Sequence, residues 1–360
     1  MKILSTGLKQ NITDALAEGV IQLSPGILEK DIHVTDALNV IAGLSPSAEF
    51  ILLRPEKDDR RPLKIQVGCT LVFAGGTCLS KAHGLIERMS EDIDIKVQLE
   101  PVPPGYGRKT NFSNRARLKE LHKQIEERLC AQGFIATFSE NTEQNKKDSA
   151  RQINNPQIRD DHRYFHLSLD YQSVFQRELI SLRAEIKVEL IHRHTLLPAT
   201  PLSFGYMLDN LLGRTSSINV TLPCISIAET LAEKVLAMLR RCAWKWYGGQ
   251  EAEMDLALVR HIYDVGQIIK LIPDALPAAC EIFPQLVETD AVEFGRQYPA
   301  FVTNPKTTLI QTLLRMETDE QLIKNYSERL LPLIYGKAAP DYVEAFRQFK
   351  FISEKLIARL

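Results

Sequence analysis

The segment "DIDIKVQL" (92–99) alternates strictly between charged or polar residues and apolar ones. Because successive side chains of a β-strand point to opposite faces, this alternation predicts a strand with one apolar and one charged face. Its isoleucines and valine then point into a core, while Asp92 and Asp94 project together, with Lys96 beyond them. A strand of this kind favours a layered fold in which the apolar face is covered by other elements.

A second segment, "RAEIKVELI" (183–191), alternates in the same way. Glu185, Lys187 and Glu189 share one face of this predicted strand, and the apolar residues between them share the other. With the apolar face packed inward, the charged face is directed toward a cleft. A salt-bridged strand surface without further function is the alternative interpretation of these charges.

Two adjacent glycines follow a third predicted strand. "CTLVFAGG" (69–76) is apolar and rich in β-branched residues, so it predicts a buried strand that ends at Gly75–Gly76, and "TCLSKAHGL" (77–85) then begins a helix. Glycine lets the backbone approach a ligand closely, and the N–H groups at a helix start can bind phosphate. Together with the hydroxyl of Thr77, the turn predicts a phosphate site. A tight turn with Thr77 as N-cap is the simpler interpretation, and it is compatible with that function.

Two carboxylates as close as those of Asp92 and Asp94 repel each other unless a cation lies between them. Mg²⁺ prefers oxygen ligands and usually keeps water and substrate phosphates. The D-x-D pair therefore predicts a platform for Mg²⁺ and a nucleotide, although an exposed, merely charged strand face has the same pattern. Glu189 would complete the site as metal ligand or base, Glu185 is the alternative third acid, and Lys187 would contact a phosphate.

The rest of the chain divides into two parts. Helical spacing covers residues 11–43 and 113–132, strands are expected near 134–140 and 164–171, and only helices are expected after about residue 200. This shift predicts an α/β domain with N-terminal helices over 1–200 and an all-helical domain over 201–360. The stretch between Pro198 and Pro201 is the expected boundary.

Composition excludes several classes of protein. The 360 residues are 44% hydrophobic and 25% charged with a net charge of −1, which excludes a globally basic nucleic-acid binder but not a local basic face. The sequence has no run of 18 or more apolar residues, so no membrane-spanning helix is predicted. The first residues do not have the pattern of a signal peptide. The six cysteines are scattered without a C-x-x-C pair, which disfavours a zinc site. We therefore expect a cytoplasmic protein with reduced thiols.

Several motifs together resemble the AbiEii/AbiGii toxin family, within the polymerase-beta-type nucleotidyltransferase superfamily. The resemblance rests on "GGTCLSKAHGL" (75–85), "RMSEDIDI" (88–95), "IKVEL" (186–190), "AEKVLAMLRR" (232–241) and "RHIYD" (260–264), and "EKDIHVTDAL" (29–38) is similar to that family's leading helix. It implies a mixed-sheet nucleotidyltransferase domain followed by helices that contribute to the active-site cleft. The implied reaction is transfer of a nucleotide from an NTP with Mg²⁺.

The resemblance also implies roles for individual residues of the first domain. Gly75, Gly76 and Thr77 would bind the triphosphate, and Lys187 would contact the nucleotide. Asp92, Asp94 and Glu189 would hold Mg²⁺.

In the helical part, Lys234 is similar to the lysine of the family's "EK" motif. Arg260 and Asp264 resemble the outer residues of its R-D-x-x-D motif, and His261 stands where the family has the middle aspartate. Either His261 replaces that aspartate as a base, or Asp264 carries the role alone. The simpler alternatives are an i,i+4 ion pair between Arg260 and Asp264 and a solvated lysine at Lys234.

Two basic stretches suggest an RNA acceptor: "RKTNFSNRARLKELHK" (108–123) and "LRRCAWKWYGG" (239–249), in which cations stand near aromatic residues. Solvated helix faces and a packed helix end are the alternatives. Relatives have been linked to tRNA modification, so the resemblance implies tRNA as the acceptor. It also implies a toxin of a toxin–antitoxin or abortive-infection system for phage defence, with an antitoxin as partner. A catalytically weak, nucleotide-binding regulator of the same fold is the rival function.

Overall fold

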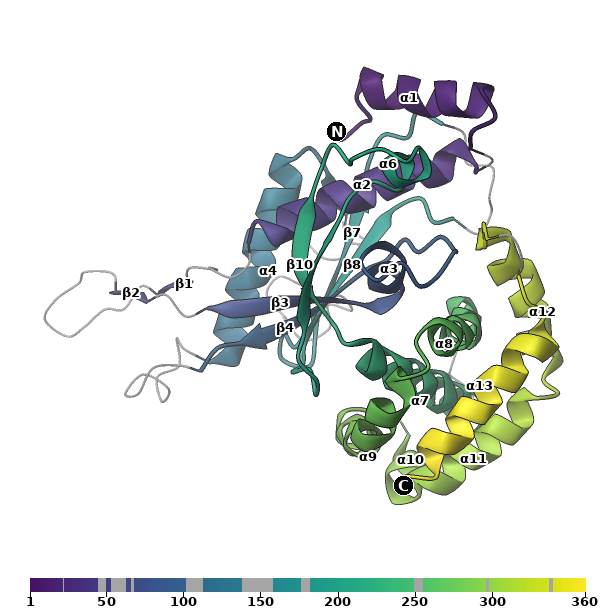
Figure 1. Ribbon diagram of the computed structural model, residues 1–360. Coiled ribbons are helices and arrows are strands. Elements are labelled where there is room, and N and C mark those ends of the chain that lie inside the picture. Colours follow the sequence, from purple (N-terminus) through teal and green to yellow (C-terminus); the bar gives the residue numbers. More distant parts are fainter. Residues whose placement is uncertain are drawn as a thin grey trace, which may run out of the picture. The chain divides into compact units, whose positions relative to one another are not determined.

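The central feature of the computed structural model is a mixed sheet of eight strands in the order β5-β7-β8-β4-β3-β10-β9, with β6 paired to β7 (Figure 1). Its strands are β3 (Cys69–Ala74), β4 (Ile93–Leu99), β5 (Ile135–Thr137), β6 (Ile158–Arg159), β7 (Tyr164–Asp170), β8 (Ile186–His192), β9 (Thr200–Phe204) and β10 (Val220–Cys224). A separate antiparallel pair joins β1 (Phe50–Leu52) and β2 (Leu63–Ile65). The structure describes residues 1–21, 23–44, 50–52, 63–65, 68–101, 113–137, 158–175, 182–248, 255–295, 298–336 and 339–360.

The middle of the sheet is formed by the strands that the sequence pattern predicts. β4 pairs with β8 in parallel and with β3 in an antiparallel arrangement. The apolar residues that alternate with the polar ones on β4 and β8 are buried, at most 7% exposed, as the predicted apolar faces require; they are Ile93, Ile95, Val97, Leu99, Ile186, Val188 and Leu190. The expectation of a mixed sheet followed by helices is thereby confirmed.

Five helices accompany the sheet in the described part of this region. They are α1 (Thr6–Ala17), α2 (Pro25–Ala42), α3 (Gly75–Lys81), α4 (Asn114–Ala131) and α6 (Met207–Leu211). α2 packs against α4 and β10, and α3 follows β3 directly and packs on β4 (Figure 1). α2 begins with a proline at its first turn, where the missing N–H costs no hydrogen bond.

Two strands lie where the sequence pattern suggested only helices. β9 and β10 pair with each other in register, and β10 joins the sheet at β3, so residues 200–204 and 220–224 belong to the sheet. Each strand contains a proline, and Pro201 lies opposite Pro223 in the register. Because proline cannot donate to a strand ladder, it weakens the sequence signal for a strand, and β9 is accordingly at the edge of the sheet.

The chain forms two compact units, one containing the sheet (1–82, 90–195 and 199–224) and one of helices (83–89, 196–198 and 225–360). The helical unit contains α7 (Ile227–Tyr247), η2 (Leu256–Val259), α8 (Arg260–Leu271), α9 (Ala275–Phe294), α10 (Pro299–Thr303), α11 (Pro305–Met316), α12 (Glu320–Asn325), η3 (Tyr326–Leu330), η4 (Leu331–Leu333) and α13 (Tyr342–Ile357). Its core is formed by the apolar faces of amphipathic helices such as α8 and α13.

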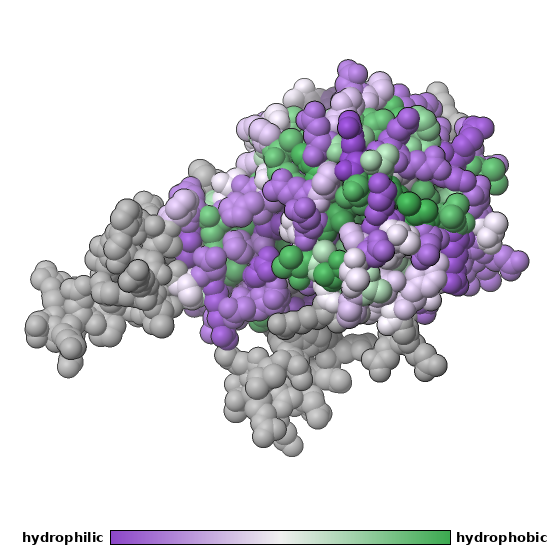
Figure 2. Space-filling view, turned by 90° about the horizontal axis from the view of Figure 1, so that it is seen from below, coloured by the Kyte–Doolittle hydropathy of each residue, from purple (hydrophilic) through white to green (hydrophobic). Residues whose placement is uncertain are grey.

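Exposed apolar side chains do occur on the helical unit, for example Val292 and Val343. Hydrophilic and hydrophobic residues are interspersed over the face shown in Figure 2. Within the described ranges, no helix combines the length and the apolar character that a membrane span requires.

Candidate functional site

The acidic residues of the sheet unit lie on neighbouring strands. Asp94 on β4 is the register partner of Glu189 on β8, and Asp92 stands two residues before Asp94, directly ahead of β4. Glu185 precedes β8, and its carbonyl oxygen accepts a hydrogen bond from Lys30. Of the two candidates for a third acid, Glu189 is therefore the one that stands beside Asp94 in the sheet.

The glycine turn lies directly against one of these acids. Gly75 has a φ of +74°, and a Cβ atom added to it would lie 1.8 Å from Oδ2 of Asp94. No side chain fits between the turn and this carboxylate, and the positive φ favours glycine as well. The turn after β3 thus lies directly against the second aspartate of the D-x-D pair.

The hydroxyl of Thr77 supports the backbone of that site. The side chain is 0% exposed, and its Oγ1 donates to the carbonyl oxygen of Asp92 and lies 3.0 Å from Oγ of Ser90. This hydroxyl therefore fixes the chain just before β4. A phosphate contact by Thr77 stays a prediction, and the N–H groups of the turn are the atoms that remain suited to it.

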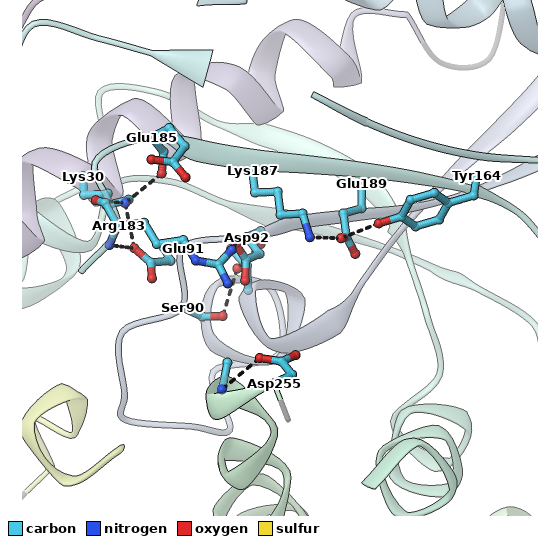
Figure 3. Close-up of polar contacts among 12 residues, drawn as sticks. Lys30, Ser90, Glu91, Asp92, Tyr164, Arg183, Glu185, Lys187, Glu189 and Asp255 are labelled. Carbon is cyan, nitrogen blue, oxygen red and sulfur yellow. Dashed lines mark hydrogen bonds and ion pairs between the residues drawn. The ribbon is translucent and has the colours of Figure 1, made fainter. Parts of the chain in front are cut away.

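Each of two acids is held by a cation of the same unit (Figure 3). Nη1 of Arg183 lies 3.0 Å from Oδ1 of Asp92, and Lys187 forms an ion pair with Glu189. The hydroxyl of Tyr164 on β7 also donates to Oε1 of Glu189 at 2.8 Å. Burial, and then the charge of Glu189, raise the pKa of Tyr164, so this hydroxyl stays protonated and acts as a donor.

A buried ion pair anchors the segment that carries Arg183. Nζ of Lys30 on α2 lies 2.6 Å from Oε2 of Glu91, and both side chains are at most 2% exposed. Lys30 also donates to the carbonyl oxygens of Arg183 at 2.6 Å and Glu185 at 3.0 Å, while Glu91 accepts from the backbone N–H of Arg183 at 3.0 Å. Burial lowers the pKa of Lys30, and the charge of Glu91 opposes that effect. The pair ties α2 to the starts of β4 and β8.

The two neighbours of Lys30 in α2 make similar connections. Glu29 accepts the backbone N–H of Val174 at 2.7 Å. Asp31 accepts from the backbone N–H of Met207 at 2.7 Å and from the ammonium group of Lys81 at the end of α3. These three consecutive charged residues are buried in α2, and their spacing alone predicted no role for them.

The carboxylates suit a magnesium ion by their chemistry. In the described part of the chain no set of three His, Cys, Asp or Glu side chains is already arranged as a metal site. Mg²⁺ does not require one, because it is commonly bound by one or two carboxylates, with waters and substrate phosphates as the other ligands. Asp92 and Asp94 provide hard oxygen ligands, and the missing side chain at Gly75 leaves the space beside Asp94 open. These residues therefore fit the ion that the sequence predicts.

The helical unit contains a second buried charge cluster. Asp264 on α8 is 0% exposed and accepts from Nε and Nη2 of Arg88, both at 2.7 Å, and from Nζ of Lys234 on α7 at 2.7 Å. Burial alone would raise the pKa of Asp264, but the two cations hold it well below its usual range. The structure thus brings Lys234 and Asp264 together, with Arg88 as a partner that the spacing did not reveal.

The remaining residues of the R-x-x-x-D motif stand on the same helix, with Arg260 one turn before Asp264. Burial, followed by the charge of Lys234, lowers the pKa of His261 well below its usual value. Its Nδ1 has no hydrogen-bond partner in the ranges that the structure describes. His261 is therefore neutral at physiological pH.

The first basic stretch keeps a row of exposed cations. Arg115, Lys119 and Lys123 are exposed at helical spacing on α4. Arg117 is buried instead and donates to the carbonyl oxygen of Glu100 at 2.9 Å. The cations predicted at 108 and 109 lie outside the described residues.

The second basic stretch is largely engaged in packing. Arg240 is buried and lies 3.0 Å from the carboxylate of Asp290, and Arg241 lies 3.1 Å from that of Asp255. The guanidinium group of Arg315 stands 4.6 Å from the ring centroid of Trp246. These contacts agree with the packed helix end that was the alternative interpretation of this stretch.

Comparison with known proteins gives one family and one fold. The family model described as nucleotidyl transferase AbiEii toxin, type IV TA system, matches residues 63–349. Among solved structures, the MenT4 nucleotidyltransferase toxin from Mycobacterium tuberculosis is similar, with a TM-score of 0.54 and 17% sequence identity. The similarity covers 98% of this chain and 90% of the other and shows a shared fold. No curated protein sequence matches the chain.

Proposed function

Because the chain belongs to the AbiEii nucleotidyl transferase toxin family, we propose that it uses Mg²⁺ to transfer a nucleotide from an NTP to an RNA acceptor, most specifically tRNA. The resemblance that the motifs suggested is confirmed, and the chain is a nucleotidyltransferase of a type IV toxin–antitoxin family. The metal, the acceptor and the individual residue roles form the proposal.

One observation carries the proposal: Gly75 lies directly against the carboxylate of Asp94, which stands beside Glu189 on the next strand. A turn without a side chain and a pair of acids on neighbouring strands form a surface where a triphosphate and its cation can lie together. Asp92, Asp94 and Glu189 would hold Mg²⁺, which when bound neutralises charge on the phosphate oxygens.

The chain's own groups would orient the reactants. The N–H groups of Gly75, Gly76 and Thr77 would bind the phosphates, and Lys187 would contact the α-phosphate from β8. An acceptor oxygen then forms a bond to the α-phosphorus, the bond from that phosphorus to the bridging oxygen breaks, and pyrophosphate leaves with the electron pair. The acceptor's proton passes to solvent or to a base. Positioning and charge neutralisation supply most of the rate in such reactions.

The helical unit contributes Lys234 and Arg260 as nucleotide-binding cations in this proposal. Asp264 is buried and its carboxylate accepts hydrogen bonds from Arg88 and Lys234, which supports a role in positioning Lys234 more than a role in proton abstraction. His261 stays the alternative base of the motif, although the burial that lowers its pKa also weakens its basicity.

RNA is the proposed acceptor because Arg115, Lys119 and Lys123 form an exposed row on α4, and RNA phosphates pair with such rows. The family implies a cognate antitoxin. A cytoplasmic location is part of the proposal, because the proposed substrates NTP and tRNA occur there. A role in phage defence is the corresponding cellular proposal.

The test is label transfer. The protein is incubated with Mg²⁺, total RNA and one labelled NTP at a time, and the labelled RNA is separated by size. Asp92→Asn should abolish transfer, while Asp160→Asn, which changes an exposed acid of the β6–β7 turn, should leave it within about twofold, as surface substitutions usually do.

Two results would contradict the proposal. Undiminished transfer by Asp92→Asn removes the D-x-D pair from the mechanism. NTP binding without transfer to any RNA supports the rival function of a nucleotide-binding regulator, for which the replacement of the motif's middle aspartate by His261 is the favouring observation.

A further inference from the structure

The proposed metal ligand Asp92 already has a cationic partner. Nη1 of Arg183 lies 3.0 Å from Oδ1 of Asp92, and the two side chains are 38% and 26% exposed. The sequence analysis did not single out Arg183, which stands three residues before β8. Arg183 is therefore a counter-ion of Asp92, the acid that the proposed reaction needs as a metal ligand.

Arg183 is held by its backbone and not only by its side chain. Its N–H donates to Glu91 and its carbonyl oxygen accepts from Lys30, and these two residues form the buried ion pair between α2 and the start of β4. Glu91 is also the immediate neighbour of Asp92. The anchor therefore delivers the guanidinium group to Asp92, yet the side chain can rotate about its own torsions without any movement of β8.

The ion pair between Arg183 and Asp92 is weak enough to be replaced when a metal ion and a triphosphate bind. The pair is partly solvated, so its attraction is modest, and a divalent ion beside Asp92 repels the guanidinium group. A triphosphate arriving with that ion carries several negative charges on oxygens that match the guanidinium fork.

We propose that Arg183 exchanges partners during the reaction: it neutralises Asp92 before metal and NTP bind, and it contacts the triphosphate afterwards. The inference rests on the proposed function, because it takes Asp92 as a metal ligand. It makes Arg183 a substrate-binding residue that also sets the metal affinity of the resting enzyme.

Two opposite changes in one variant test the exchange. Mn²⁺ binding to the nucleotide-free protein is followed by electron paramagnetic resonance, and KM for the preferred NTP is measured by label transfer. Arg183→Gln removes the competing cation, so Mn²⁺ should bind about two- to fivefold more tightly, the range for a partly exposed ion pair. KM should rise about tenfold or more, as expected for loss of a charge-assisted hydrogen bond. If Arg183 had only a structural role, its replacement would lower the Mn²⁺ affinity and raise KM.

Matched variants isolate the effect. Arg183→Lys keeps the charge without the fork, so its metal affinity should stay near that of the unchanged protein while KM rises by less than in Arg183→Gln. Arg163→Gln removes an arginine that pairs with the exposed Asp160, and both readouts should stay unchanged.

The outcomes separate the two proposals. Metal affinity that is unchanged or lower in Arg183→Gln overturns the exchange, and so does tighter metal binding with an unchanged KM. If Asp92→Asn keeps both metal binding and transfer, the proposed function itself fails, whatever Arg183→Gln does.

Discussion

Gly75→Ala is the substitution whose effect follows most directly from the geometry of the site. The new Cβ would lie 1.8 Å from Oδ2 of Asp94, where ordinary contacts begin at 3.4 Å. The carboxylate must therefore retreat, because the backbone of Gly75 is fixed between β3 and α3. An L-residue at this positive φ also costs roughly 1–2 kcal/mol of folding free energy.

Gly213→Ala provides the matched control. Gly213 also has a positive φ, +64°, and belongs to the same compact unit, but a Cβ there meets nothing within 4 Å. Both variants should lose a similar roughly 1–2 kcal/mol in urea unfolding from backbone strain. Only Gly75→Ala should lose transfer, by at least about 100-fold, because a displacement of about 1 Å in a reacting group has that effect.

Label transfer and urea unfolding are measured on the same preparations of both variants. Transfer by Gly75→Ala within about threefold of Gly213→Ala would show that the position of Asp94 against the turn does not matter for the reaction, since a misplaced group costs far more. A much larger loss of stability in Gly75→Ala than in Gly213→Ala would show that the clash is absorbed by the fold and not by the carboxylate.

Three further predictions test the supports of the site and the core of the sheet unit. Tyr164→Phe removes the hydrogen bond to Glu189. Mn²⁺ binding, measured by titration, should weaken about tenfold, as it does when other groups that orient metal ligands are lost. Unchanged Mn²⁺ binding would argue against Glu189 as a metal ligand. Lys30→Met leaves Glu91 buried without its cationic partner and should lower the free energy of unfolding, measured in urea, by about 3–5 kcal/mol. The double variant Lys30→Met/Glu91→Leu should regain most of this stability but not the transfer activity. Burial lowers the pKa of His33 to about 4 from 6.5, so the unfolded chain binds the extra proton first, and stability should fall by up to about 3 kcal/mol as pH decreases from 6.5 toward 4. In His33→Phe the free energy of unfolding should change less between pH 6.5 and pH 4. An unchanged pH dependence would show that other groups cause it.

Local periodicity was enough to predict the strands that form the middle of the sheet. The alternation in 92–99 and 183–191 encodes which side chains share a face, and the structure places Asp94 beside Glu189 accordingly. Which of Glu185 and Glu189 lies beside Asp94 was not available from spacing, because it depends on the register between β4 and β8. The strands at 200–224 were missed because each carries a proline in a short segment.

The supports of the site were beyond the reach of spacing for a different reason. Arg183 and Asp92 are 91 residues apart in the chain, and Arg88 and Asp264 are 176 apart. The sequence around a single arginine or lysine does not show which distant residue it will contact in the folded protein. The three buried charges of α2 stand next to one another in the sequence, but adjacency does not show which residues they contact.

The sequence by itself determined the faces of the strands, the glycine turn and the acids, because these follow from repeats of two residues and from the freedom of glycine near Asp94. Only the tertiary structure decided which distant residues contact the acids: Arg183 for Asp92, and Tyr164 for Glu189. The physical reason is that pairing between distant segments is fixed by packing and strand register, which join residues that no local pattern relates.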